Sequence, residues 1–198
     1  MTGSLAVLSQ TVLGNALFPK ARLFRNTLLV IGGSLALALS AKIQVPFWPV
    51  PMTMQSMVAL LIGLSLGARL GALTILAYLA EGAAGLPVFA GMAAGPVYLA
   101  GPTGGYLLGF LLGGALAGWA AEHGVGRDLP RILAVMLLGH VVIFAPGVLW
   151  LAALMGWDKA VAFGVAPFIL ASLLKSGLGA AFASALWWLT DRRHGAGR

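Results

Sequence analysis

Long apolar runs without any charged side chain make up most of this 198-residue chain, and short polar connectors separate them. Asp, Glu, Lys and Arg are absent from residues 26–41, 43–68, 82–121, 132–157, 160–174 and 176–190. A helix needs about 20 mainly apolar residues to cross a bilayer. The pattern therefore predicts an all-α integral membrane protein with about six transmembrane helices, at roughly 26–44, 52–67, 70–88, 103–121, 131–154 and 163–190.

The composition narrows the class of protein further. Hydrophobic residues form 60% of the chain and charged residues 9%, whereas soluble domains carry roughly 25% charged residues. This balance excludes a soluble domain and also a disordered chain, which would be poor in apolar residues. We expect one membrane domain over residues 1–198, with a cytoplasmic or interfacial segment at 1–25, a six-helix bundle at 26–190 and a cytoplasmic tail at 191–198.

The few cations predict the orientation of the bundle, because Lys and Arg gather on the cytoplasmic side of a membrane. With six spans and the N-terminus inside, the opposite side holds only Lys42 and Lys159. The cytoplasmic side holds Lys20, Arg22, Arg25, Arg69, Arg127, Arg131, Arg192, Arg193 and Arg198. Both termini are therefore expected in the cytoplasm, and the net charge of +7 marks topology rather than nucleic-acid binding.

Two connectors on the predicted outer side have an unusual backbone. Residues 43–53 read IQVPFWPVPMT, and the three prolines exclude a regular helix. Residues 82–103 carry no formal charge, many glycines and three further prolines. Non-helical backbone at membrane depth must be buried in protein or line a cavity. The first connector is either a proline-stiffened link or a rigid lid with aromatic faces, and the location of both on one side favours a ligand site that opens outward.

Charged residues inside predicted spans are expensive and mark functional sites. Lys175 lies in the middle of the sixth span, where its ammonium would suit a ligand carboxylate or a buried carboxylate partner. Glu81 lies near the outer end of the third span, where a functional and a structural role are equally compatible with the sequence. A pair between Glu81 and Lys175 is one option. His140 is interpreted as a hydrogen-bonded core histidine.

Further polar groups near the two connectors are candidates for hydrogen bonds to a ligand. Thr53 and Gln55 begin the second span, with Ser56 beside them. Backbone amides at the start of the fourth span can receive a polar or anionic group, and they belong to residues near Thr103: Gly101, Gly104 and Gly105. No metal ligand set, catalytic set or Walker motif is found, so no cofactor, metal or enzymatic activity is expected.

Small residues at helical spacing predict close helix packing in two spans. Glycines recur every four residues from Gly101 to Gly113, and intramolecular packing is the favoured interpretation from Gly109 onward. The first span has a row of small residues that suits packing within the protein or against a membrane partner: Ser34, Ala38 and Ala41.

Several stretches of this chain resemble the biotin-specific S component (BioY family) of energy-coupling-factor (ECF) vitamin transporters. The resemblance covers most of the chain, and its most distinctive run is GPTGGYLLGF at 101–110. The other matching stretches are SAKIQV at 40–45, PVPMTMQ at 49–55, GARLGA at 67–72 and GLPVFAG at 85–91.

The resemblance implies a six-helix bundle with an outward cavity beneath the first and third connectors, in a bacterial cell membrane. It also implies high-affinity capture of biotin and partnership with a transmembrane coupling protein and two cytoplasmic ATPases. The row at Ser34, Ala38 and Ala41 would contact the coupling protein. Lys175 matches a lysine of the family's sixth-span motif, whereas Ser172 stands where the family has an acidic residue that would bind the ureido ring.

Biotin combines a carboxylate, an apolar tail with a thioether ring, and a ureido group. Lys175 would neutralise the carboxylate or anchor the polar ring, and Thr53, Gln55 and Thr103 would supply neutral contacts. The apolar part would be covered by Phe47, Trp48, Phe89, Tyr98 and Tyr106.

The sequence leaves three alternatives. The chain is an S component for another small vitamin-like carboxylate, an ion-coupled carrier that uses Glu81 as its proton site, or an intramembrane enzyme, which the missing catalytic set disfavours. It also leaves open whether the chain forms homo-oligomers.

Overall fold

The computed structural model describes residues 22–125 and 128–195. In this part of the chain the helices of 12 residues or more are α3 (Arg22–Ser40), α4 (Gln55–Leu66), α5 (Ala68–Ala83), α7 (Gly104–Ala120), α8 (Leu129–Met155) and α10 (Phe168–Gly195). Shorter elements join them: β1 (Gln44–Val45), β2 (Met52–Thr53), η1 (Ala90–Met92), α6 (Pro96–Ala100), η2 (Ala121–Val125) and α9 (Trp157–Gly164). The mainly helical fold expected from the sequence is confirmed.

Within residues 22–125 and 128–195, four stretches are long and apolar enough to cross a membrane: Leu23–Ser40, Gly104–Val125, Leu129–Met155 and Phe168–Leu189. α4 and α5 are shorter, with 12 and 16 residues. The predicted third span ran to residue 88, but α5 ends at Ala83, because Gly85 adopts a positive φ of 98° and Pro87 follows it. The predicted sixth span merged two helices, α9 and α10, which a turn at residues 165–167 separates.

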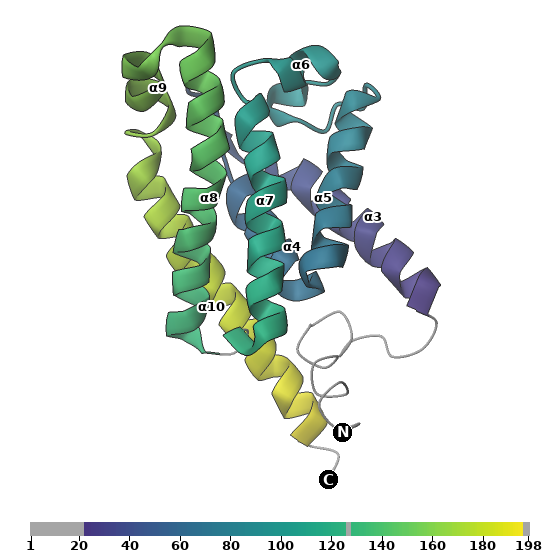
Figure 1. The fold of residues 1–198 in the computed structure, drawn as a ribbon. Coiled ribbons are helices and arrows are strands. Elements are labelled where there is room, and N and C mark those ends of the chain that lie inside the picture. Colours follow the sequence, from purple (N-terminus) through teal and green to yellow (C-terminus); the bar gives the residue numbers. More distant parts are fainter. Residues whose placement is uncertain (1–21, 126–127, 196–198) are drawn as a thin grey trace.

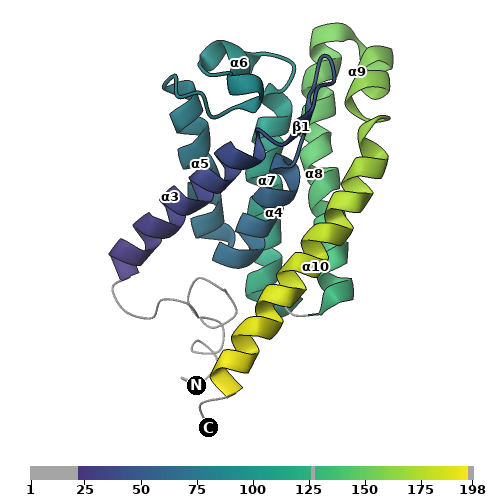
Figure 2. The same ribbon diagram turned by 180° about the vertical axis from the view of Figure 1, so that it is seen from behind.

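Consecutive long helices run in opposite directions, so the connectors meet at two ends of the bundle (Figure 1). One end, the loop end, carries the β1–β2 hairpin, α6 and α9. α7 lies at the centre and packs against α4, α5 and α8. Seen from behind, α3 and α10 lie in front of these helices, with β1 between their upper parts (Figure 2).

Glycines allow the helices around α7 to approach it until the backbones are in contact. A Cβ added at Gly63 of α4 would lie 2.0 Å from the carbonyl oxygen of Gly114 on α7. A Cβ at Gly109 would lie 2.4 Å from the Ile143 carbonyl oxygen on α8. Both distances are too short for any side chain. The packing interpretation of the fourth-span glycines from Gly109 onward is therefore confirmed.

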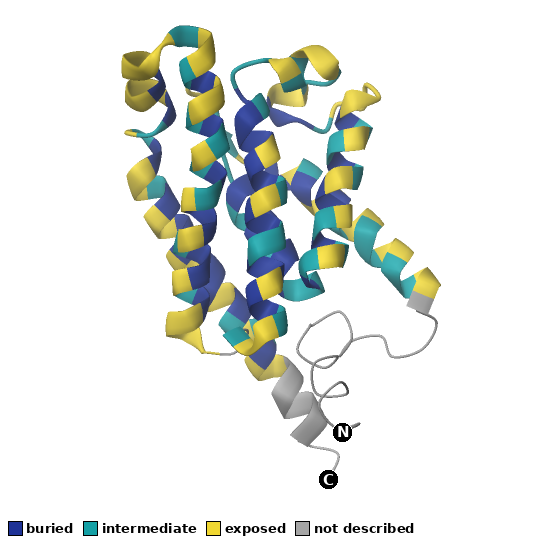
Figure 3. Cartoon of the chain, viewed as in Figure 1, coloured by how far each residue is buried: buried dark blue, intermediate teal, exposed yellow. Residues whose placement is uncertain are grey.

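Large apolar side chains cover much of the exterior of the bundle, as expected for a protein that faces lipid (Figure 3). α3 shows this most strongly, because Ile31, Leu35 and Leu39 are all more than half exposed. The small-residue row of the same helix has the opposite orientation. Ser34 and Ala41 are buried in the protein, so the row packs inside the chain, and the apolar stripe faces outward.

The described cations divide between the two ends of the bundle. Lys42 and Lys159 lie at the loop end, and Arg25, Arg69 and Arg131 lie at the opposite end. Arg22, Arg192 and Arg193 also belong to the opposite end, as residues of α3 and α10. The segment 1–21, with Lys20, and the residues Arg127 and Arg198 lie outside the described residues.

The contact between Gly63 and Gly114 generates a stability prediction. Gly63→Ala should force α4 away from α7 and lower the melting temperature of the purified protein by about 3–10 °C, since overpacking costs about 1–3 kcal/mol and 1 kcal/mol shifts Tm by about 2–4 °C at this size. The control is Gly32→Ala on α3, where an added Cβ meets no atom within 4 Å. Equal melting temperatures for the two variants would contradict the packing argument.

Candidate ligand-binding site

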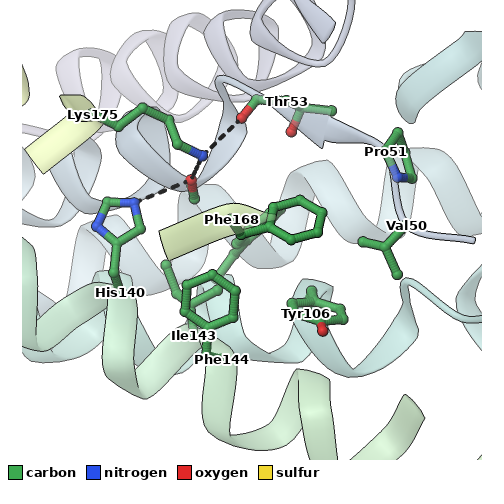
Figure 4. A pocket seen from close by; sticks show the side chains of 11 residues that line it. Val50, Pro51, Thr53, Tyr106, His140, Ile143, Phe144, Phe168 and Lys175 are labelled. Carbon is green, nitrogen blue, oxygen red and sulfur yellow. Dashed lines mark hydrogen bonds between the residues drawn. The ribbon is translucent and has the colours of Figure 1, made fainter. Parts of the chain in front are cut away.

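A small cavity of about 50 Å³ lies inside the bundle, between the β1–β2 hairpin and the helices α4, α7, α8 and α10 (Figure 4). Its wall is apolar on one side and polar on the other. The lining residues are Val50, Pro51, Thr53, Ser56, Tyr106, Phe110, His140, Ile143, Phe144, Phe168 and Lys175.

Lys175 places a cation at the polar end of this inner cavity. Its side chain comes from α10 and is 8% exposed. The ammonium donates hydrogen bonds to the carbonyl oxygen of Thr53 at 3.2 Å and to Oγ of Ser56 at 2.8 Å. Among the described residues no carboxylate forms an ion pair with it. Lys175 is thus a buried charge with neutral partners only, which costs free energy until an anion or a strong acceptor joins it.

A chain of buried polar side chains continues from Ser56 toward α8. Oγ of Ser56 lies 3.2 Å from Nε2 of His140. The other ring nitrogen, Nδ1, lies 2.9 Å from the carbonyl oxygen of Met136 and 3.0 Å from Oγ of Ser176. The interpretation of His140 as a hydrogen-bonded histidine is confirmed, and the structure adds that it borders the cavity.

Aromatic rings form the apolar wall of the inner cavity. Phe144 of α8 meets Tyr106 at a ring-centroid distance of 6.0 Å and Phe168 at 6.2 Å, both edge to face. Phe47 of the hairpin meets Phe168 at 6.3 Å. The Tyr106 hydroxyl donates to the carbonyl oxygen of Gly164 at 2.9 Å, which holds its ring in place. The wall can cover a flat apolar group.

A second, larger cavity of about 690 Å³ opens at the loop end, between the hairpin and the α5–α7 connector. Pro51 borders both cavities and separates them. The outer cavity is lined by Gln44, Pro46, Phe47, Pro49, Pro51, Ala90, Gly91, Ala93, Ala94, Val97, Tyr98, Gly101, Pro102 and Thr103. The two connectors that the sequence marks as special therefore form opposite walls of one cavity.

Lys42 joins these two connectors directly. Its ammonium donates to the carbonyl oxygens of Pro87 and Phe89, both at 2.8 Å.

Tyr98 lines the outer cavity from the same connector, and burial raises the pKa of its hydroxyl above the ordinary value of 10. It therefore stays neutral at physiological pH.

The structure brings only some of the predicted contacts to the cavities. Thr53, Tyr106 and Lys175 line the inner cavity. Phe47, Tyr98, Gly101 and Thr103 line the outer cavity.

The aromatic residues Phe89 and Trp48 lie elsewhere. Phe89 is fully buried in the core between Tyr78, at 5.5 Å, and Tyr98, at 5.0 Å. Trp48 is 78% exposed. Neither ring borders the two cavities.

Gln55 and two of the three glycines serve the fold instead. The Gln55 amide donates to the Tyr78 hydroxyl, and its oxygen accepts from Thr53 Oγ1 at 3.1 Å. A Cβ at Gly104 would lie 1.9 Å from the Leu99 carbonyl oxygen, and one at Gly105 would lie 2.4 Å from that of Pro146. Close backbone contact thus explains both glycines, and neither borders the two cavities.

Ser172 and Glu81 do not line the inner cavity with Lys175. Ser172 borders an apolar groove formed by α8 and α10 rather than the inner cavity, and its buried hydroxyl has no hydrogen-bond partner among the described residues. The Glu81 carboxylate accepts a hydrogen bond from the Ser34 hydroxyl and joins α5 to α3. The suggested pair between Glu81 and Lys175 is therefore not formed.

Sequence reasoning missed most of the apolar wall. Phe144 and His140 lie four residues apart on α8, and Phe110 and Tyr106 lie four apart on α7, so each pair shares a helix face. That spacing is ordinary in apolar helices and does not distinguish a cavity wall from a packed core. His140 is the only polar side chain of the α8 pair. A polar residue inside an apolar helix is the signal that could have identified this face of α8 as part of the cavity wall.

The profile of the BioY family matches residues 10–192. The "Biotin transporter BioY2" of Lactococcus lactis subsp. cremoris is 34% identical over 83% of this chain and 91% of its own length. The "Biotin transporter BioY" of Thermotoga maritima is 38% identical over 79% of this chain and 86% of its own. A crystal structure of the S-component for biotin from an ECF-type ABC transporter shares the fold with a TM-score of 0.73 and 22% identity, over 83% of this chain and 92% of that one.

The Lys42 contacts predict the stability of the α5–α7 connector. In Lys42→Met, residues 84–95 lose two charge-assisted hydrogen bonds, and their backbone amides should exchange with solvent about 5-fold to 30-fold faster, which corresponds to a loss of about 1–2 kcal/mol. Lys159→Met, at an exposed lysine of the same end, is the control. Unchanged exchange in 84–95, or an equal change in both variants, would show that Lys42 does not hold the connector.

Proposed function

The chain belongs to the BioY family, and we propose from this premise that it captures biotin as the S component of an ECF-type importer. The named relatives are biotin transporters, and the fold is that of a biotin S-component. The single observation in this chain that carries the proposal is Lys175. A buried ammonium with neutral partners, beside an aromatic wall, requires a ligand that is polar at one end and apolar along its body.

Biotin meets both requirements. Two N–H groups of Lys175 are occupied by Thr53 and Ser56, which would leave the third to contact the ligand. It either neutralises the carboxylate or donates to the ureido carbonyl. The rings of Tyr106, Phe144 and Phe168 would cover the apolar body of the ligand.

The cavity sizes imply that the hairpin moves when the ligand binds. Ligand sites usually have volumes of about 300–1,000 Å³, so the inner cavity of about 50 Å³ is too small and the outer cavity of about 690 Å³ is large enough. Biotin would enter the outer cavity first. A shift of Pro51, which separates the two, would then open the way to Lys175.

The proposed orientation places the loop end outside the cell and the other end in the cytoplasm, with all six long helices spanning the membrane. The distribution of cations supports it, because Arg25, Arg69 and Arg131 lie at the end opposite the loops. α4 and α5 are short for a full crossing of the bilayer. Neighbouring helices would shield the ends of these two helices from lipid. The expected location is the inner or plasma membrane.

Transport requires partners in this proposal, as in the ECF-type transporter whose S-component shares the fold. They would be a transmembrane coupling protein and two cytoplasmic ATPases. In this proposal the exposed apolar stripe of α3, with Ile31, Leu35 and Leu39, would contact the coupling protein in place of lipid. The buried Ser34 and Ala41 would pack α3 against the rest of the bundle and would not contact the partner.

Removal of the Lys175 ammonium tests the binding site. Lys175→Met keeps much of the aliphatic stem, and we expect the affinity for biotin, measured by calorimetry on the purified protein, to fall at least about 100-fold, or about 2.7 kcal/mol. Lys159→Met is the matched control and should bind as the original chain does. Unchanged affinity in Lys175→Met would refute the assignment.

The neutral primary amide of biotin shows which end of the ligand Lys175 contacts. If the carboxylate is the contact, the original chain should bind the amide far more weakly than biotin, and Lys175→Met should bind both alike. If the ureido group is the contact, both ligands should lose affinity equally in Lys175→Met.

Uptake in cells without other biotin importers tests the need for partners. Accumulation of labelled biotin should require co-expression of the coupling protein and ATPases, and replacement of the Walker lysine in the ATPases should abolish accumulation while binding to the membranes persists. Accumulation without the ATPases that collapses with an uncoupler would instead indicate an ion-coupled carrier.

A further inference from the structure

We infer that His140 is a positioning residue that orients the Lys175 ammonium for the ligand and acts through the Ser56 hydroxyl. The inference rests on the proposed function, because it concerns the same cavity. The three side chains come from three different helices, α8, α10 and α4, and converge at the polar end of that cavity (Figure 4). All are at least nine-tenths buried, with exposures of 3%, 8% and 8%.

The first argument concerns the proton of Ser56. An ammonium can only donate, so the 2.8 Å contact with Lys175 makes Oγ of Ser56 an acceptor. The hydroxyl has one proton of its own to donate. The acceptor within reach is Nε2 of His140, at 3.2 Å. When Ser56 donates this proton to Nε2, Nε2 carries a lone pair, and the order of donation runs from Lys175 through Ser56 to His140.

The second argument concerns the other ring nitrogen and is independent of Lys175. The Met136 carbonyl oxygen can only accept, so Nδ1 of His140, 2.9 Å away, must carry the proton. Oγ of Ser176, at 3.0 Å, can share the same N–H. The two arguments assign the same tautomer, a neutral ring protonated on Nδ1 with Nε2 as acceptor.

This tautomer determines what Ser56 offers to Lys175. While Ser56 donates to Nε2, its lone pairs face the ammonium and fix one of the three N–H groups. Thr53 fixes the second through its carbonyl oxygen, and the third is left for the ligand. Without an acceptor at the Nε2 position, the Ser56 hydroxyl can turn, and the Lys175 side chain gains freedom that binding must remove.

A comparison of variants at His140 and Ser56 tests the inference by biotin affinity. His140→Phe removes the acceptor and should weaken binding about 10-fold. His140→Gln can place an amide oxygen near the Nε2 position and should recover most of that loss. Ser56→Ala should also weaken binding about 10-fold.

The double variant separates positioning from general destabilisation. Because His140 acts through Ser56, Ser56→Ala/His140→Phe should bind no more than about 3-fold more weakly than Ser56→Ala alone. Independent effects would multiply to about 100-fold and would overturn the inference. Equal affinity of His140→Phe and the original chain would overturn it as well.

A second histidine provides the control. His123 lies in η2, is exposed, and also has Nδ1 close to the carbonyl oxygen four residues earlier, Trp119, at 2.8 Å. It has the same local contact without a link to Lys175. His123→Phe should leave the affinity unchanged, and a loss equal to that of His140→Phe would refute the specific role of His140.

A spectroscopic measurement does not depend on the folding of any variant. Nitrogen NMR of the full chain with labelled histidine should show His140 as a neutral ring with a proton on Nδ1 and none on Nε2. A proton on Nε2 would overturn the inference. If the original chain binds no biotin, the proposed function fails. If it binds biotin but His140 carries its proton on Nε2, or the effects of the two substitutions multiply, only the role of His140 is refuted.

Discussion

The rest of the site depends on one constraint, the burial of the Lys175 ammonium without a counter-ion among the described residues. In an apolar bundle such a charge is destabilising unless every available partner is positioned around it. Thr53 and Ser56 supply neutral oxygens, and the polar chain through His140 extends this support to a third helix. Within the described part of the chain, no anion or further acceptor contacts the last N–H group. A ligand that provides such an acceptor would gain binding free energy from its contact with the Lys175 ammonium.

The glycine-rich contacts of α7 make this arrangement possible. α4, α7 and α8 approach until the backbone of one helix touches that of the next, as at Gly63 and Gly114 or at Gly109 and Ile143. Because these helices cannot shift without losing close packing, the side chains that they carry toward the cavity have fixed positions. Helix packing therefore fixes the shape of the candidate site, although none of these glycines lines the inner cavity.

The loop end has a different physical character. Its walls are two connectors whose prolines and glycines allow only short helical turns, and their link is made by exposed or half-buried contacts such as those of Lys42. Segments held by few buried contacts open at lower free energy than the core does. The rigid inner wall and the weaker outer connection together suit a ligand that enters through the loops and is held deep in the bundle.

The sequence alone determined the class of protein and singled out Lys175 as the leading candidate for ligand binding. Charge-free runs long enough for a bilayer show a membrane bundle, and a lysine within such a run is conspicuous because lipid excludes charge. The motifs at 40–55 and 101–110 were sufficient to place the chain in its family. The two connectors were expected at one end of the bundle beside a ligand site, and both line the outer cavity.

Only the tertiary structure decided which side chains meet. Phe89 and Gln55 are as suitable for a ligand as Tyr106 and Ser56 by residue type, yet the first two are used in the core and the last two line the cavity. Ser34 and Ala41 proved to face inward, and Glu81 proved to contact Ser34 rather than Lys175. Such choices depend on how helices distant in sequence rotate against one another. The periodicity of one helix defines its faces but not the neighbour that each face meets.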